Sequence, residues 1–440
     1  MKTKLMISIL LIAAWQGFAQ VRMLSLKDAL ALGMSDNQEL KIARLDVERA
    51  GQQKIISRSY LLPSMNLVGQ VNHYFQLPAF FGFGEANGND KVPYGRFGGK
   101  DQLMTAVTLY QPLYHPSALP AIRVSNYELH QSKVSLNRSE VMVLSDIKQT
   151  YIRILVLRER IALQRESLTR NKKVLKDSRS LFLQGKALRV DTLRAYTAVR
   201  NLEPTLAKLE FDCDTETLSL KAKLAIPSDT MIDFADSLSV PDIYSLPTEA
   251  EVYQEALANN QGLRQLELQK EIQEERVKSA TALRMPSIGL TGQYQVQSQT
   301  DDFDYGNAYY PTSSFVGLQL SLPLFNGFAT QAKVKRAMLE RAQAIEVKQQ
   351  AIDELRALVH DVMAKNHESR LRLETSLVVK ETAQTSYNII LYRYQNGIAS
   401  RLELTDAELT LSTAQSNSLE AVYDYLSARI GLFQLMGKVE

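Results

Sequence analysis

The sequence predicts a mostly α-helical, internally duplicated chain that contributes four transmembrane strands to a membrane β-barrel. Three observations lead to this fold class. The same order of segments occurs twice in the 440 residues. Each copy has two alternating segments of about ten residues, which is the length of a tilted transmembrane strand. Each copy then continues into a stretch of roughly 68 residues with almost no Gly or Pro, as expected of a very long helix.

The N-terminus indicates export from the cytoplasm. Lys2 and Lys4 flank the start of an apolar run, Leu5–Ala14, and small residues follow as far as Ala19. A basic start, a short apolar run and a small-residue cleavage site are typical of a secretory signal peptide, and this run is too short for a permanent membrane span. We therefore predict a signal peptide over 1–19, with a buried N-terminal helix as the alternative.

Composition excludes several classes of protein. The formal net charge falls from +3 to +1 when the two lysines of the signal peptide are removed, which argues against a nucleic-acid partner. The single cysteine, Cys213, cannot form an intrachain disulfide. After the signal peptide no run of about eighteen apolar residues occurs, so no transmembrane helix is expected. An exported chain can still enter the outer membrane through strands of alternating hydrophobicity.

An internal duplication organises the chain. At a shift of 223 residues, Asn37–Leu40 aligns with Asn260–Leu263, both beginning Asn-Gln and ending in Leu. At a shift of 212 residues, Gly185 aligns with Gly397. Several matches in one order indicate that one structural unit has been copied, with the change in shift falling between strands, where loops tolerate changes of length.

Each repeat has the same predicted layout of a helix, two strands separated by a loop, and a long helical hairpin. The first repeat covers 20–245, with strands at 64–74 and 103–113 and a hairpin that turns near 185. The second repeat covers 246–440, with strands at 287–297 and 314–324 and a hairpin that turns near 397.

The predicted strands have one apolar and one polar face. In the clearest of them, Ile288, Leu290 and Val296 alternate with Thr291 and Gln293. Such a pattern fits a transmembrane strand between lipid and a wet lumen, and it also fits a half-buried soluble sheet. The length of each strand and the aromatic residues near the strand ends favour the membrane interpretation.

The long helical stretches carry heptad patterns. In the first stretch, apolar residues recur every seven positions, at Ile147, Ile154, Ile161, Leu168, Leu175 and Phe182. A helix of this length extends about 100 Å at about 1.5 Å per residue, and a heptad seam indicates coiled-coil packing with a neighbouring helix. Pro204 should kink the returning helix of the first hairpin.

Four strands cannot close a barrel by themselves. An open sheet edge in lipid leaves unpaired backbone N–H and C=O groups, each at a cost of several kcal/mol. We therefore expect three copies to share a 12-stranded barrel, with the helices of the trimer continuing as a coiled-coil barrel in the periplasm.

The layout resembles the TolC-type outer membrane efflux protein family over essentially the whole mature chain. The resemblance rests on the Asn-Gln segments, on Pro63 and Pro286 before strands, on Pro323–Gly327, and on Tyr394–Gly397 followed by Leu402–Ala407. It implies a homotrimeric outer-membrane channel without a cofactor. In the family, such channels receive substrates from an inner-membrane pump of the RND, ABC or MFS type through a periplasmic adaptor, and they serve drug efflux or type I protein secretion.

The resemblance also points to a periplasmic aperture at the tip of the second hairpin. Glu403 and Asp406 match positions at which the family places acidic rings, and Tyr394 and Gly397 lie in the matching tip. A spacing of three residues puts both acids on one face of a helix, where rings of carboxylates favour cations. The alternative is that these acids are simply solvated charges at a hairpin turn.

The first hairpin is expected to lie outside the aperture. Its turn is at Gly185, and at the positions of the two acids it has Asp191 and Arg194. A ring that combined an acid with an arginine would not provide the same stacked negative charge.

No constellation indicates an enzyme or a metal site. His360 and His367 are seven residues apart, whereas metal-binding pairs on helices more often use a four-residue step. Cys213 lies on a heptad core position and is expected to act as a small apolar side chain. We expect no catalytic residue, no metal and no nucleic-acid partner.

A basic stripe lies beside the heptad seam, at Arg158, Arg165, Lys172 and Arg179. We expect a solvated or intersubunit face that pairs with acids; the alternative is a basic lining.

Two other classes of protein remain open, a periplasmic adaptor and a coiled-coil scaffold without a pore. Adaptors usually have one helical hairpin, whereas this chain has two, each preceded by a pair of strands.

Overall fold

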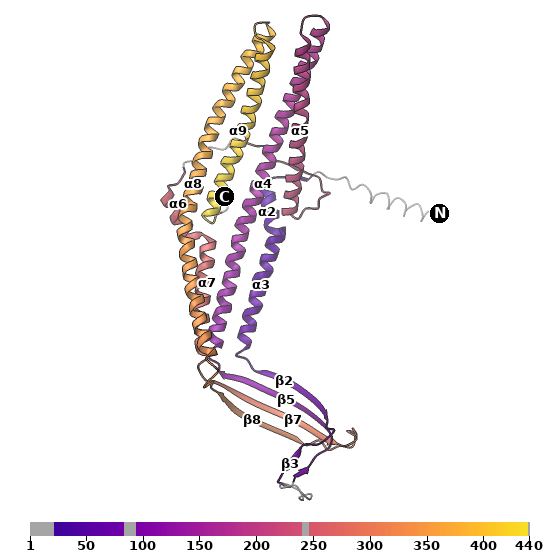
Figure 1. Cartoon of the computed structure of the whole chain (residues 1–440), viewed down its shortest axis with the longest axis vertical. Coiled ribbons are helices and arrows are strands. Elements are labelled where there is room, and N and C mark those ends of the chain that lie inside the picture. Colours follow the sequence, from indigo (N-terminus) through magenta and orange to yellow (C-terminus); the bar gives the residue numbers. More distant parts are fainter. Residues whose placement is uncertain (1–21, 83–93, 240–245, 439–440) are drawn as a thin grey trace, which may run out of the picture. The chain divides into compact units, whose positions relative to one another are not determined.

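The computed structural model describes residues 22–82, 94–239 and 246–438, and the predicted signal peptide lies outside these ranges. The first half contains β1 (Arg22–Leu24), α2 (Leu26–Asp36), α3 (Gln38–Ser59), β2 (Ser64–His73), β3 (Ala79–Phe81), β4 (Tyr94–Arg96), β5 (Asp101–Tyr114), α4 (Ala118–Leu183), α5 (Arg189–Lys223) and β6 (Ile232–Phe234). The second half contains α6 (Glu249–Asn259), α7 (Gln261–Ala282), β7 (Ser287–Thr300), β8 (Thr312–Ser321), α8 (Ala329–Gln395) and α9 (Arg401–Leu435). Figure 1 shows these elements.

The chain divides into two compact units, and each unit draws on both halves of the sequence. One unit comprises the residues up to 46, 132–265 and 348 onward, and it contains both helical hairpin turns. The other comprises 47–131 and 266–347, and it contains the main sheet. The predicted repeat boundary after residue 245 borders a segment outside the described residues and stays a prediction.

The main sheet is antiparallel and has the strand order β2-β5-β7-β8, as Figure 1 shows. The central pair, β5 and β7, joins the two halves of the sequence through thirteen residue pairs with one register shift near Pro112. Among the described residues of the single chain, β2 pairs only with β5, and β8 pairs only with β7. Both edges of this sheet are therefore open.

The strand register confirms the predicted division of the sheet into two faces. Leu67 lies opposite Val107, which lies opposite Tyr294, so these three side chains share one face. Asn66 lies opposite Thr108 on the other face. One face of the sheet is consequently apolar and the other is polar.

The polar face of β7 has a ladder of glutamine amides. Gln293 Nε2 donates to Gln295 Oε1 at 2.7 Å, and Gln295 Nε2 donates to Gln297 Oε1 at 3.1 Å. These amides occupy alternate positions of one strand and therefore point in the same direction. Such a row suits a water-filled space better than lipid.

Three of the four strands differ clearly in extent from the sequence prediction. The strand expected at 103–113 runs over Asp101–Tyr114, the one expected at 287–297 runs over Ser287–Thr300, and the one expected at 314–324 runs over Thr312–Ser321. The earlier end of the last strand has a simple cause, because Pro323 has no N–H to donate to a strand ladder.

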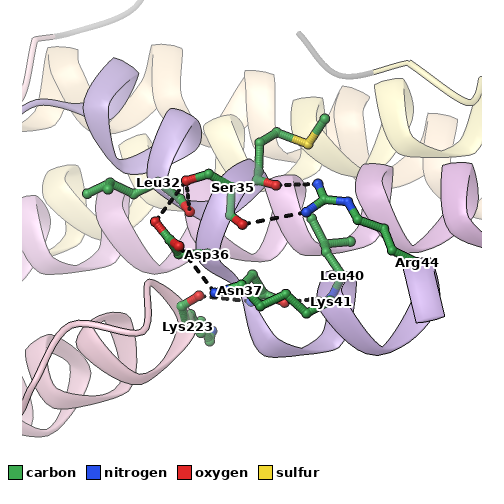
Figure 2. A network of polar contacts seen from close by, with 9 residues as sticks. Leu32, Ser35, Asp36, Asn37, Leu40, Lys41, Arg44 and Lys223 are labelled. Carbon is green, nitrogen blue, oxygen red and sulfur yellow. Dashed lines mark hydrogen bonds and ion pairs between the residues drawn. The ribbon is translucent and has the colours of Figure 1, made fainter.

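The helix expected before the strands of each repeat is interrupted at an asparagine of the Asn-Gln segments, which separates α2 from α3 and α6 from α7. Asn37 ends α2 and caps α3: its Oδ1 accepts from the Leu40 N–H at 3.1 Å, and its Nδ2 donates to the Lys223 carbonyl at 2.8 Å (Figure 2). In the second half, Asn260 Oδ1 accepts from the Leu263 N–H at 3.1 Å. An asparagine side chain that caps the following helix explains why this residue opens both segments, so their role is structural.

The long helices are confirmed as single elements. α4 has 66 residues and α8 has 67, so each extends about 100 Å. The heptad residues of α4 are buried as predicted from Ile147 to Leu175, whereas Phe182, near the turn, is 41 % exposed. None of the helices in the described part of the chain combines the length and apolar character that crossing a bilayer requires.

Packing around Tyr151 stabilises one end of the first hairpin. Its ring lies 5.3 Å from that of Phe234, and its hydroxyl donates to the Leu24 carbonyl at 2.9 Å and to Asp236 Oδ2 at 2.8 Å. Burial and the neighbouring Asp236 carboxylate raise the pKa of the Tyr151 phenol. The tyrosine thus remains a neutral donor that ties β1 and the chain after β6 to α4.

Candidate functional site

The two hairpin turns have the same backbone design. Gly185 and Gly397 adopt φ values of 73° and 74°, in the left-handed region that favours glycine. The Gly185 N–H donates to Phe182 and the next N–H donates back to Leu181, both at 2.9 Å. The turn at Gly397 repeats both bonds, at 3.0 and 2.8 Å. This pair of bonds is a Schellman motif, which ends a helix where the chain must reverse.

The carboxylate of Glu403 caps its own helix. Ser400 N–H donates to Glu403 Oε1 at 3.0 Å, and Glu403 N–H donates to Ser400 Oγ at 3.2 Å, which forms a capping box at the start of α9. These hydrogen bonds lower the pKa of Glu403. Glu403 is exposed and ionised at neutral pH, and its carboxylate is fixed by the turn.

Asp406 follows Glu403 on the same exposed face of α9. Tyr394 is different: it lies partly buried at the end of α8, beside the core of the second hairpin. The Arg401 guanidinium lies 6.0 Å from the centre of the Tyr394 ring. Of the four residues predicted for the aperture, the two acids are exposed on one helix, Gly397 makes the turn and the Tyr394 carbonyl accepts from the Gly397 N–H.

Small and aromatic residues fill the core beneath this tip. Ala407, Leu411 and Ala414 of α9 pack against Ala383 and Tyr387 of α8. Two of the four α9 residues in this core, Ala407 and Ala414, are small, which favours a close approach of the two helices of the second hairpin.

Glu408 joins the two hairpins, a contact that the sequence analysis did not foresee. The residue is 8 % exposed, and its Oε1 accepts from Arg170 Nε at 3.1 Å and from Asn171 Nδ2 at 3.0 Å. Ser167 Oγ lies 3.5 Å from the same oxygen. Arg170 also pairs with Glu166 at 2.7 Å, so a charged network holds α9 of the second hairpin against α4 of the first.

A second polar contact joins the same two helices. Arg160 of α4 donates to Glu420 at 2.8 Å and to Ser416 at 3.1 Å, both on α9. Arg153 lies 5.4 Å from the centre of the Tyr423 ring. Polar contacts therefore connect α4 and α9 at several levels.

The basic stripe on α4 is partly neutralised within the chain, as one of its two interpretations predicted. Arg158 pairs with Asp233 at 2.9 Å, and Arg165 pairs with Glu210 at 2.6 Å. These two arginines therefore brace α4 against β6 and α5.

The histidines do not come together. His360 Nδ1 lies 3.4 Å from Glu249 Oε2 on the exposed surface. Among the residues that the structure describes, no group of three or more His, Cys, Asp and Glu side chains is arranged to hold a metal ion. Cys213 is half-buried beside the core around Tyr151, and burial raises the pKa of its thiol.

Strands with one apolar and one polar face, joined in one chain to two hairpins that each contain a helix of about 100 Å, define a channel component of the outer membrane. More particularly, the chain belongs to the outer membrane efflux protein family, whose model matches residues 32–225 and 252–438. The two matched segments correspond to the two halves of the sequence.

Relatives and solved structures agree with this assignment. The chain is 22 % identical over 430 residues to the pyoverdine export outer membrane protein OpmQ of Pseudomonas aeruginosa, covering 96 % of this chain and 86 % of that protein. It is 22 % identical over 427 residues to the alkaline protease secretion protein AprF of the same species, covering 93 % and 85 %. Its fold matches VceC of Vibrio cholerae with a TM-score of 0.73 at 16 % identity, covering 94 % of this chain and 96 % of that one. It matches the CmeC channel of Campylobacter jejuni with a TM-score of 0.75 at 17 % identity, covering 94 % and 85 %.

The chain is therefore an outer-membrane efflux channel, as the resemblance implied. Its family consists of transport ducts, which sets aside both the adaptor and the scaffold alternatives.

Proposed function

We propose that three copies of this chain form one duct, with a shared 12-stranded barrel in the outer membrane and helical hairpins in the periplasm. The observation that carries the proposal is the open four-stranded sheet with one apolar and one polar face. Leu67 and Leu318, on the apolar face, are each 72 % exposed in the single chain. Lipid would cover such side chains, and joining β2 of one copy to β8 of the next would satisfy both edges.

Cross-linking in mild detergent tests the number of copies. Purified protein treated with an amine-reactive reagent should give a product with three times the mass of the chain. A mass-photometry reading before cross-linking serves as the control for collisions between separate particles. A monomer that still conducts ions in a bilayer would contradict the shared barrel.

The duct is proposed to receive its cargo from an inner-membrane pump through a periplasmic adaptor. Support comes from the relatives, one named for pyoverdine export and one for alkaline protease secretion. A small molecule and a protein leave the cell by ducts of one family, so the choice of cargo is proposed to lie with the pump and not with the duct.

The tip of the second hairpin is proposed as the closing point of the duct. The exposed Glu403 and Asp406 would give two stacked rings of three carboxylates in a trimer, an arrangement that attracts cations. Glu408, one turn further along α9, fixes the resting position of this hairpin against α4. Opening then requires the second hairpin to move as a unit, with docked partners stabilising the displaced state.

A further inference from the structure

The two hairpin tips differ strongly in charge although they are copies of one unit. At the shift of 212 residues, 168–198 in the first hairpin corresponds to 380–410 in the second. The first stretch has eight basic and two acidic residues, a formal charge of +6, whereas the second has three basic and four acidic residues, a formal charge of −1. Because both tips form the same turn, the difference in charge between them is not needed to form the turn.

The positive charge of the first tip lies on the surface and is not neutralised within the chain. Seven of its basic side chains are exposed, and none of them forms an ion pair among the described residues: Lys172, Lys173, Lys176, Arg179, Lys186, Arg189 and Arg194. Like charges this close repel one another, so the cluster is unfavourable for the isolated hairpin.

Large apolar side chains are exposed in the middle of this charge. Leu183 is 85 % exposed and Leu188 is 71 % exposed. The corresponding residues of the second hairpin are polar, Gln395 and Ser400. Ser400 caps α9, whereas Leu188 stands at the N-cap of α5 without a side-chain hydrogen bond. The first hairpin thus lacks the cap of its copy and presents a leucine to solvent, which indicates a contact surface.

We propose that this surface, made of the seven basic residues with Leu183 and Leu188 at its centre, docks an acidic segment of the periplasmic adaptor. The inference rests on the proposed function and adds the chemistry of the partner. An apolar centre within a charged rim is the usual anatomy of a protein interface, and opposite charge on the partner sets the register and speeds association.

A second copy of the chain does not supply the necessary acids. Of the four acidic residues in the second tip, Glu408 is buried against Arg170. Only Glu381, Glu403 and Asp406 remain to face seven basic side chains. The positive surface consequently needs a partner of another kind, and the two hairpins of each chain are unequal docking sites.

Site-specific photo-cross-linking in cells tests the proposal. A benzophenone amino acid replaces Leu183 in the full-length channel, and the cross-linked peptide is identified by mass spectrometry. We expect an acidic segment of a periplasmic protein. Adding Lys186→Glu and Arg189→Glu should lower the cross-link yield at least about tenfold, because like charges then face each other. Reversing the acids of the captured segment should restore the yield.

The second hairpin provides the matched control. Lys380→Glu and Arg393→Glu reverse two exposed charges in its corresponding stretch, and the cross-link at residue 183 should keep its wild-type yield. Capture of a phospholipid, of another copy of the channel or of a segment without net negative charge would overturn the inference, as would absence of any product. Bilayer conductance of the Lys186→Glu, Arg189→Glu variant separates the two proposals: if it conducts while the cross-link result is negative, the duct stands and the docking chemistry is wrong.

Discussion

Glu408 holds the second hairpin to the first through donors on a single helix of the other hairpin. Two of these donors, Ser167 and Asn171, are themselves buried, so water does not readily replace the carboxylate. The side chain of Arg170 is only 22 % exposed, so its charged guanidinium would lose the Glu408 carboxylate with little water to replace it. The network around Glu408 therefore contributes more to the stability of the fold than an ordinary surface ion pair does.

Replacing Glu408 with Ala should lower the free energy of unfolding by on the order of 3 kcal/mol, because three donors lose their acceptor. Glu420→Ala is the matched control, since Glu420 pairs with Arg160 between the same helices but its side chain is 49 % exposed. We expect it to cost less than about 1 kcal/mol. Denaturant unfolding monitored by circular dichroism measures both variants. Equal losses of stability in the two variants would contradict the larger contribution assigned to the Glu408 network.

The proposed aperture can be tested without disturbing the turn. Glu403→Gln keeps an oxygen that can cap the Ser400 N–H, whereas Ala would remove both the charge and the cap. The double variant Glu403→Gln, Asp406→Asn should therefore fold normally and show weaker selectivity for cations over anions. Reversal potentials in a salt gradient across a planar bilayer measure this.

Asp191→Asn in the first hairpin is the control for the aperture experiment, because that hairpin is expected to lie outside the narrow point. An unchanged reversal potential in the double variant would refute the aperture assignment and leave the channel itself in place.

At the scale of elements, the hairpin turns require glycine because of its backbone conformation, and not because a side chain would lack room. A Cβ added at Gly397 would meet nothing within 4 Å, yet φ is +74°. Gly397→Ala should therefore cost about 1 kcal/mol of stability through backbone strain alone. Gly51, inside α3, also has open space around it, and Gly51→Ala should instead stabilise by up to about 1 kcal/mol. Thermal unfolding compares the two; a loss at both positions would point to hidden contacts.

Elements with a strong local period could be predicted from the sequence. The seam from Ile147 to Leu175 repeats every seven residues, and the alternation in β7 follows from residues two apart, so both patterns are visible along the chain. The break at Asn37 was missed because neither Gly nor Pro marks it; an asparagine side chain replaces the helical hydrogen bonds there.

Contacts between distant segments could not be predicted in this way. Arg170 and Glu408 are 238 residues apart, and nothing in the local pattern of either helix indicates that they meet. Glu403 was recognised as an acid of the tip, but its capping role depends on the start of α9, and helix ends are poorly marked in sequence.

At the scale of the whole molecule, duplication explains how one chain supplies both the wall of a duct and its proposed closing point. Each half provides two strands of the main sheet and one hairpin. The halves have diverged at their tips, where the first is strongly basic and the second carries the proposed aperture acids. The two copies thus share one architecture, and the tasks proposed for their tips differ.

Single-channel recording tests the central claim most directly. Purified trimer added to one side of a planar lipid bilayer should insert and give discrete, uniform conductance steps. A chain without residues 287–321, which contain β7 and β8, should give none, because the sheet cannot then supply its share of the barrel. Absence of steps from the intact, folded protein, or equal conductance from the shortened chain, would contradict the account.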